Sequence, residues 1–270
     1  MARTKIAYGP HSQQFGHVFL PDTAAVTGPV PVVMVVHGGS WHARYGLTLG
    51  TALAAELARR GLVVWNVEYR RLGAGGAWPE MSADIVAAFE AITTLVAPHA
   101  RQAGIDVDLD RIRLVGHSAG GQLAVWLAGE ITSRRPEFVV SQAGALDLVS
   151  AGERGRRVEQ FELLFGAPYD GAPETYRSAS PMHRVPIGVP VVVLHGDADE
   201  QVPVSVARRY AEAARAAGDP VSDEEFDGED HVAFLNRTTR AWARSLELLT
   251  VDSAADLGFV ADLQARSAGE

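Results

Sequence analysis

Short apolar runs rich in valine recur along the chain, and segments with helical periodicity separate them. Unbroken apolar runs of this length are typical of strands that are buried on both faces of a parallel sheet. We predict such strands at residues 32–36, 62–67, 111–115, 138–142, 189–195 and 221–226. The alternation indicates an α/β fold, with a mostly parallel central sheet of about eight strands and helices on both of its faces.

Helical periodicity fills most of the gaps between these strands. We predict helices at residues 49–60, 82–95, 204–217 and 234–249, and one more directly after Ser118. In the second of them, five apolar residues share one face: Ile85, Ala88, Phe89, Ile92 and Leu95. Ser82 stands where this helix would take its N-cap, and Gly61 stands where the first helix would take its C-cap.

Three segments depart from this rhythm. Residues 15–20 suggest a hairpin on one edge of the sheet. Residues 150–186 contain a basic stretch (Arg154, Arg156 and Arg157) and then an apolar one. We interpret them as a lid-like insertion over the carboxyl edge of the sheet, where ligands bind in such folds. We expect residues 1–250 to form one domain, and the weakly patterned tail at 251–270 to be mobile.

The sequence Gly-His-Ser-Ala-Gly at residues 116–120 lies between a predicted strand and a predicted helix. In that context a Gly-x-Ser-x-Gly turn places its serine on a sharp elbow, so Ser118 is the candidate nucleophile. Gly116 and Gly120 suit the crowding, because a side chain on either would clash where strand and helix cross. The alternative is a serine that caps an ordinary turn between strand and helix.

A serine nucleophile needs a base, and it needs an acid that orients the base. Asp199 lies in the loop after the strand at 189–195 and is the candidate acid. Its neighbour Asp197 is an alternative that could instead form an Asx turn. Asp147, after the preceding strand, is a weaker candidate.

His231 is the candidate base, because it alone of the nine histidines lies in a loop after the last predicted strand. It follows Asp199 by 32 residues, which leaves room for one helix and one strand. His37 and His195 stand before glycine at strand ends and are interpreted as structural, and His117 should point away from the nucleophile. Four other histidines have no clear context and are expected to be exposed: His11, His17, His99 and His183.

The loop after the first strand of the parallel series reads His-Gly-Gly-Ser-Trp at residues 37–41. Two glycines let the backbone turn its N–H groups toward a ligand, and acyl transfer needs such donors for the oxyanion. We predict an oxyanion hole from the N–H of Ala119 with those of Gly39, Ser40 or both. Three residues that follow are expected to shape the substrate pocket: Trp41, His42 and Tyr45. Weaker candidates, equally compatible with core packing, are Trp78, Gln122, Phe165 and Val202.

Together these elements resemble the α/β-hydrolases, in the esterase and lipase group that includes hormone-sensitive-lipase-like enzymes and kynurenine formamidases. The segment His37-Gly38-Gly39-Ser40-Trp41 is similar to the His-Gly-Gly-x-Trp of the formamidases, and residues 195–203 resemble the acid loop of many members. Hormone-sensitive-lipase-like enzymes usually carry a third glycine where this chain has Ser40. The resemblance covers about residues 5–250 and implies the α/β-hydrolase fold with a Ser-His-Asp triad.

Composition excludes several classes of partner and chemistry but leaves the predicted fold unchanged. The formal net charge of −9 argues against a nucleic-acid partner. The absence of cysteine removes disulfides, thiolate metal sites and a cysteine nucleophile. No apolar segment follows the basic N-terminus, and the longest apolar run, residues 30–36, is too short to span a bilayer. We expect a cytoplasmic protein with no metal, cofactor or membrane partner.

The sequence therefore predicts a serine hydrolase that cleaves a small carboxylic ester or amide through Ser118, His231 and Asp199. One alternative is an arylformamidase acting on formamides that resemble N-formylkynurenine. A peptidase-like or acyl-transfer enzyme is a weaker alternative, because such peptidases normally carry a propeller domain that 270 residues leave no room for. A non-catalytic binding protein of this fold is weaker still, since such members usually lose the histidine or the acid.

Overall fold

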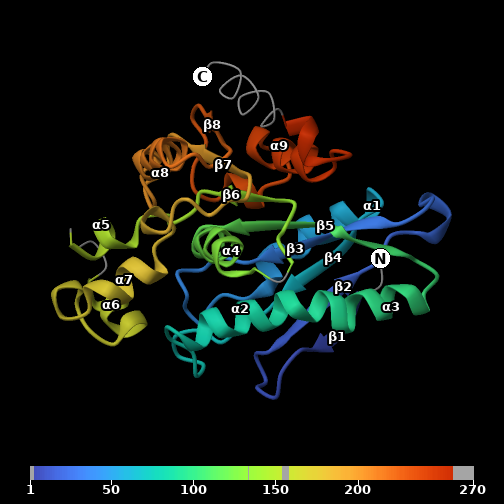
Figure 1. Ribbon diagram of the computed structural model, residues 1–270, viewed down its shortest axis with the longest axis horizontal. Coiled ribbons are helices and arrows are strands. Elements are labelled where there is room, and N and C mark those ends of the chain that lie inside the picture. The colour runs from blue at the N-terminus through green and yellow to red at the C-terminus, as the bar shows by residue number, and fades with distance from the viewer. Residues whose placement is uncertain (1–2, 133, 154–157, 258–270) are drawn as a thin grey trace.

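A central sheet of eight strands organises the computed structural model, which describes residues 3–132, 134–153 and 158–257 (Figure 1). Its order is β1-β2-β4-β3-β5-β6-β7-β8. The strands are β1 (Arg3–Ala7), β2 (Phe15–Phe19), β3 (Val30–Val36), β4 (Val63–Val67), β5 (Val107–His117), β6 (Phe138–Gln142), β7 (Val191–Gly196) and β8 (Val221–Phe226). Strands β3 to β8 run parallel, while β1 and β2 form an antiparallel hairpin beside β4. The predicted mostly parallel sheet and its edge hairpin are confirmed.

The parallel strands are buried on both faces, as their unbroken apolar sequences predict. In β3, Val32 and Met34 face one side of the sheet and Val33 and Val35 face the other, and all four are buried. The two sides correspond to two separate apolar clusters, each closed by helices. Because successive side chains of a strand point to opposite faces, one strand contributes residues to both apolar cores.

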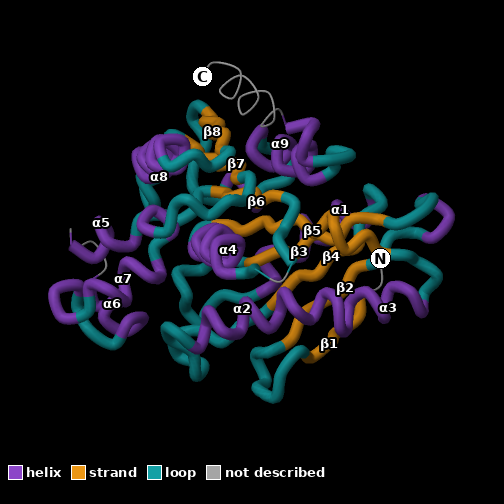
Figure 2. The backbone as a smooth tube through the Cα atoms, viewed as in Figure 1, coloured by secondary structure: helices purple, strands orange, loops and turns teal. Residues whose placement is uncertain are grey.

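Helices cover both faces of the sheet, also as predicted (Figure 2). On one face lie α1 (Thr51–Arg59) and α9 (Arg240–Leu249). On the other lie α2 (Glu80–Ala91), α3 (Ala97–Gln102), α4 (Ala119–Glu130) and α8 (Val204–Ala216). Three short helices between β6 and β7 project beside this layer: α5 (Leu148–Glu153), α6 (Val158–Phe165) and α7 (Pro173–Ala179).

Two predicted helix starts are wrong. Helix α2 begins at Glu80 with Pro79 at the N-cap, and the Ser82 hydroxyl donates back to the Pro79 carbonyl (2.8 Å) inside the first turn. The last helix begins at Arg240 and not at residue 234, because Thr239 takes the N-cap and accepts the Trp242 N–H (3.2 Å). A separate 3-10 turn at Ala233–Leu235 precedes it.

The helical segment after β4 is longer than the predicted 82–95. It runs from Glu80 to Gln102, through a π-helical turn at Ile92–Val96. By length and composition alone it is the one helix of the described chain that could cross a membrane, but 56% of its most apolar window is buried inside the protein. That burial is what the core helix of an α/β sheet requires.

The segment predicted as a lid-like insertion contains α5, α6 and α7, although its basic stretch at 154–157 lies outside the described residues. Most of the tail expected to be mobile, residues 258–270, also lies outside them. Residues Ala254–Leu257 of that tail form a short 3-10 helix.

Strand β5 and helix α4 cross with almost no space between their backbones. A Cβ added to Gly116 would lie 2.1 Å from the Gly120 carbonyl oxygen, and one added to Gly120 would lie 2.1 Å from the Val36 carbonyl oxygen. No side chain fits at such distances. The predicted crowding at both glycines is confirmed, and it fixes where the start of α4 meets the sheet.

We therefore expect Gly120→Ala to reduce the free energy of unfolding by about 3 kcal/mol, because neither backbone can give way without moving the sheet. Urea denaturation measures the change. Gly171→Ala is the matched control, since a Cβ there meets atoms no closer than 3.6 Å, an ordinary contact distance. Equal stability losses in the two variants would contradict the close packing at Gly120.

Candidate active site

Ser118 lies at the turn between β5 and α4 with a backbone conformation that only a constrained residue adopts. Its φ is 56° and its ψ is −119°, a region that costs about 1–3 kcal/mol for a residue with a side chain. Hydrogen bonds hold the backbone there: the Ser118 N–H donates to the Gln142 carbonyl (2.8 Å), and its own carbonyl accepts from Ala145 N–H (3.2 Å). Strand β6 and the loop after it therefore force the serine into an elbow.

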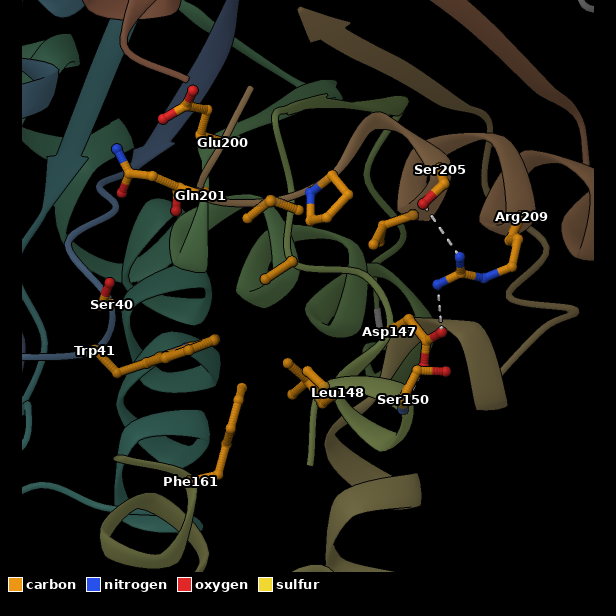
Figure 3. Close-up of a pocket in the computed structure, with 16 residues that line it drawn as sticks. Ser40, Trp41, Asp147, Leu148, Ser150, Phe161, Glu200, Gln201, Ser205 and Arg209 are labelled. Carbon is orange, nitrogen blue, oxygen red and sulfur yellow. Dashed lines mark hydrogen bonds and ion pairs between the residues drawn. The ribbon is translucent and has the colours of Figure 1, made fainter. Parts of the chain in front are cut away.

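The elbow opens into a cavity of about 460 Å³ that Ser118 helps to line (Figure 3). Figure 3 shows Ser40 and Trp41 on one side of this cavity, Ser205 and Arg209 on the other, and Phe161 below. Leu148, Ser150, Ala151 and Phe161 reach it from α5 and α6, so helices of the insertion form part of its wall.

Asp199 and His231 form a buried pair. His231 Nδ1 lies 2.6 Å from Asp199 Oδ2, and both residues are less than a tenth exposed. Burial acts to raise the pKa of Asp199, but hydrogen bonds from His195, His231 and the Val202 N–H hold it well below its ordinary value. Asp199 is therefore an ionised carboxylate that accepts from the Nδ1 side of His231.

The two alternative acids lie elsewhere. Asp197 is exposed, and its Oδ1 accepts the Gly228 N–H (2.7 Å), which ties the loop after β7 to the loop after β8. Asp147 lines the far end of the cavity and pairs with Arg209 (2.9 Å). Neither has a contact with His231 among those of the described residues, so geometry favours Asp199 as its partner.

His117 lies outside the lining of the cavity and contacts His231 from behind. Its Nε2 donates to the His231 carbonyl (2.8 Å), and the two rings lie 4.8 Å apart. Its Nδ1 is buried with no hydrogen-bond partner. Burial above all, together with the nearby His231 ring, lowers the pKa of His117 to about 4. A neutral ring with its proton on Nε2 therefore positions the backbone of His231.

The loop at residues 38–41 approaches the elbow very closely. A Cβ on Gly38 would lie 3.0 Å from that of Ser118. Gly39, Ser40 and Trp41 follow with φ values of 113°, 53° and 57°, so two residues with side chains adopt the left-handed region in succession. This strained turn brings Ser40 into the cavity wall next to Ser118.

Buried polar contacts fix the loop from behind. His37 Nε2 lies 2.8 Å from Glu68 Oε1, and its ring stacks on Tyr69. Burial acts to raise the pKa of Glu68, but the hydrogen bond with His37 and the nearby Arg71 guanidinium hold it below its ordinary value. The structural interpretation of His37 is confirmed. On the cavity side, the Trp41 indole N–H donates to Gln122 (3.0 Å).

The family of the chain follows from comparison with known proteins. The model of the BD-FAE family matches residues 17–213. The chain belongs to the BD-FAE family.

A curated relative resembles the chain over most of its length. The BD-FAE chain is 30% identical to Esterase LipC of Mycobacterium tuberculosis over 232 residues, which cover 79% of this chain and 55% of LipC. The chain spans about half the length of the curated relatives it matches.

Solved structures share its fold at lower identity. The esterase Est2 of Thermogutta terrifontis matches with a TM-score of 0.71 and 22% identity over 91% of this chain and 89% of Est2. An acetyl ester-xyloside bifunctional hydrolase from Caldicellulosiruptor lactoaceticus matches with a TM-score of 0.74 and 19% identity, over 95% and 97% of the two chains. The predicted α/β-hydrolase fold and the resemblance to its esterase and lipase group are confirmed.

Of the residues predicted to shape the pocket in this BD-FAE protein, Trp41 lines the cavity and the other two do not. His42 is exposed, and its Nδ1 accepts the Arg44 N–H (3.1 Å). Tyr45 lies outside the cavity, where it packs against Gly39 from behind. The chain turns away after Trp41 because of the left-handed residues before it. His42 and Tyr45 therefore belong to the support of the loop.

Of the four weaker candidates for the pocket lining, one lines the cavity and three do not. Val202 lines the cavity, whereas Gln122 lies behind Trp41 and donates to the Ala179 carbonyl (2.8 Å). Trp78 and Phe165 pack against each other, 6.3 Å between ring centres, away from the cavity.

Several residues of the site have no clear signal in the sequence. Phe161 and Leu148 reach the cavity from short helices whose faces cannot be assigned from so few residues. Arg209 lies on α8, and from the sequence a basic residue on a surface helix would be expected to face the solvent. His195 contacts Asp199 (3.1 Å), and its spacing of four residues before the acid is the one sequence feature that could have indicated this. Two histidines expected to be exposed, His17 and His99, are half-buried.

Oxygen and nitrogen ligands for a metal do not converge in the part of the chain that the structure describes. No three His, Asp or Glu side chains there are arranged to hold an ion.

The depressed pKa of His117 makes stability depend on pH. Because the unfolded chain binds a proton near pH 6.5 and the folded one only near pH 4, stability falls as pH drops through that window. We expect this residue to account for a loss of about 3 kcal/mol in the free energy of unfolding between pH 7 and pH 4.

His117→Gln keeps a donor for the His231 carbonyl and removes the titrating ring. Urea denaturation at pH 7 and pH 4 should show a smaller loss in the variant than in the wild type by that amount. Parallel losses in the two proteins would contradict the buried neutral state of His117.

Proposed function

We propose that this BD-FAE protein hydrolyses a small carboxylic ester through a covalent acyl-enzyme on Ser118. The observation that carries the proposal is the buried pair of His231 and Asp199 beside a serine elbow that opens into a cavity. A nucleophile, an imidazole base and a carboxylate that orients the base are the three parts that acyl transfer by serine needs.

In the proposed reaction, Ser118 Oγ attacks the carbonyl carbon of the ester while His231 Nε2 takes its proton. The oxygen of the tetrahedral intermediate accepts N–H groups of Ala119 and of Gly39, Ser40 or both. His231 then protonates the leaving alcohol, and the acyl group stays on Ser118. In the second half of the reaction, His231 takes a proton from water, and the water oxygen attacks the carbonyl carbon of the acyl-enzyme. His231 then returns the proton to Ser118 Oγ as the bond between Oγ and the acyl group breaks, which releases the acid. Asp199 keeps the Nδ1 proton on His231 and stabilises the imidazolium that forms.

The ends of the cavity differ in polarity, which bears on the substrate. Trp41, Leu148 and Phe161 offer apolar surface near the proposed nucleophile, and the paired Asp147 and Arg209 offer hydrogen bonds at the far end. A cavity of about 460 Å³ suits a small ester. We propose that the insertion serves as a cover, since α5 and α6 supply the part of the cavity wall that adjoins the loop at 38–41.

Known relatives support the reaction class. LipC is named an esterase, and Est2 is described as a thermophilic esterase. The cytoplasmic setting stays a prediction that rests on the sequence alone.

Ser118→Ala tests the nucleophile. We expect the variant to lose at least about a thousandfold in kcat on p-nitrophenyl acetate, because the step that splits the ester no longer exists. N-formylkynurenine is assayed alongside, and the ratio of the two kcat/KM values separates an esterase from a formamidase. Activity that survives in Ser118→Ala would overturn the proposed mechanism.

Phe161→Ala tests the role of the cover. Its ring lies 5.8 Å from Trp41 and closes the apolar part of the cavity, so its removal should admit longer acyl chains. We expect the ratio of kcat/KM for p-nitrophenyl octanoate to that for the acetate to rise about tenfold. Leu163→Ala is the matched control, because Leu163 lies on the same helix and is 68% exposed. A ratio that rises equally in both variants, or in neither, would contradict the assignment.

A further inference from the structure

Asp199 has a second imidazole on the oxygen that faces His231. His195 Nε2 lies 3.1 Å from Asp199 Oδ2, the same oxygen that His231 Nδ1 approaches at 2.6 Å. The other oxygen, Oδ1, accepts the N–H groups of Gln201 (2.8 Å) and Val202 (2.9 Å). Two backbone N–H groups therefore hold one oxygen of the buried carboxylate, and two imidazole nitrogens lie against the other.

The proton on His195 can be placed from its neighbours. Nε2 faces two acceptors, Asp199 Oδ2 and the Val202 carbonyl (2.8 Å), so it must carry a hydrogen. Nδ1 is buried and has no hydrogen-bond partner among the described residues. A proton on Nδ1 would be desolvated without an acceptor, so His195 is the Nε2–H tautomer.

We propose that His195 is a positioning residue for the reaction, which holds Asp199 Oδ2 in place for His231 through its Nε2–H. The inference rests on the proposed function, because it assigns His195 a role in the same Ser118, His231 and Asp199 system. His195 acts through Asp199 and does not contact the cavity.

Two consequences follow from this contact. The carboxylate cannot rotate without losing its contact with His195 Nε2, so His231 keeps the orientation that proton transfer needs. The N–H dipole of His195 also reduces the negative potential that Asp199 exerts on His231. Without that dipole the protonated form of His231 is favoured. As the pH is lowered, His231 would then take up its proton earlier, and activity would start to fall at a higher pH than in the wild type.

Four titratable groups of the described residues face His195: Glu225, His117, Asp199 and His231. Glu225 lies beside it on β8 and is paired with Arg208. His117 approaches from the elbow side, and Asp199 and His231 from the loops after β7 and β8. None of these is changed by a substitution at position 195.

The test compares His195→Gln with His195→Asn. The glutamine amide nitrogen can reach the place of Nε2, whereas that of asparagine is one bond too short. We expect His195→Asn to lose about 10- to 100-fold in kcat with KM within about threefold of wild type, and its acid limb of kcat/KM to move up by about half a pH unit. His195→Gln should keep kcat within about fivefold and retain the wild-type pH profile.

The amplitude of the initial p-nitrophenol burst gives the fraction of enzyme molecules that are active. Each kcat value is divided by this fraction, so that misfolded protein does not lower it. His99→Asn, on α3 at a distance from the cavity, controls for the loss of a half-buried histidine. If both variants at position 195 lower Tm but keep the wild-type kcat and acid limb, the role is structural alone and the inference is overturned.

A measurement on the wild type keeps the inference testable if a variant does not fold. Long-range ¹⁵N–¹H spectra, with the His195 signals assigned by their loss in His195→Gln or His195→Asn, should show the hydrogen on Nε2. A hydrogen on Nδ1 alone would overturn the inference, because Nε2 could not then donate. Activity surviving in Ser118→Ala would remove the proposed function and this inference together. Activity lost there but unaffected in His195→Asn would remove this inference only.

Discussion

The contact on which the site depends is the close approach of α4 to β5 at Gly116 and to β3 at Gly120. The backbones approach so closely there that a methyl group on either glycine would overlap a carbonyl oxygen. Because the helix starts directly on the strand, Ser118 has to make the whole change of direction within one residue, and its positive φ is the result. A looser crossing would let the serine relax into an ordinary helix cap, with its side chain turned toward the backbone.

A second close approach brings together the loops that hold Asp199 and His231. A Cβ on Gly196 would lie 2.0 Å from the Glu229 carbonyl oxygen, and Asp197 bonds across to Gly228. The loops after β7 and β8 are thus joined on the exposed side while Asp199 and His231 meet on the buried side. Backbone contacts, and not long flexible side chains, set the distance between the two ionisable groups.

Much of this arrangement could be predicted from the sequence. Strand positions follow from apolar runs, and the order of Ser118, Asp199 and His231 follows from where each lies relative to a strand. Helix starts were less predictable, because a serine such as Ser82 bonds back to the chain equally well inside a first turn as at a cap. The cavity wall was the least predictable part. His42 and Tyr45 are adjacent to the loop in sequence but are directed away by two left-handed residues, while Phe161 comes from a helix more than a hundred residues further along.

Hydrogen bonds join the proposed cover to the loop at 38–41. Gln122 accepts the Trp41 indole N–H and donates to the Ala179 carbonyl at the end of α7, and Gln160 of α6 donates to the Ser40 carbonyl. A segment that forms part of the cavity wall is therefore fastened to the segment that would stabilise the oxyanion. In such a molecule, selectivity and rate cannot evolve as separate traits: a cover that shifts to admit a different acyl group also moves Ser40, so each new preference carries its own change in turnover.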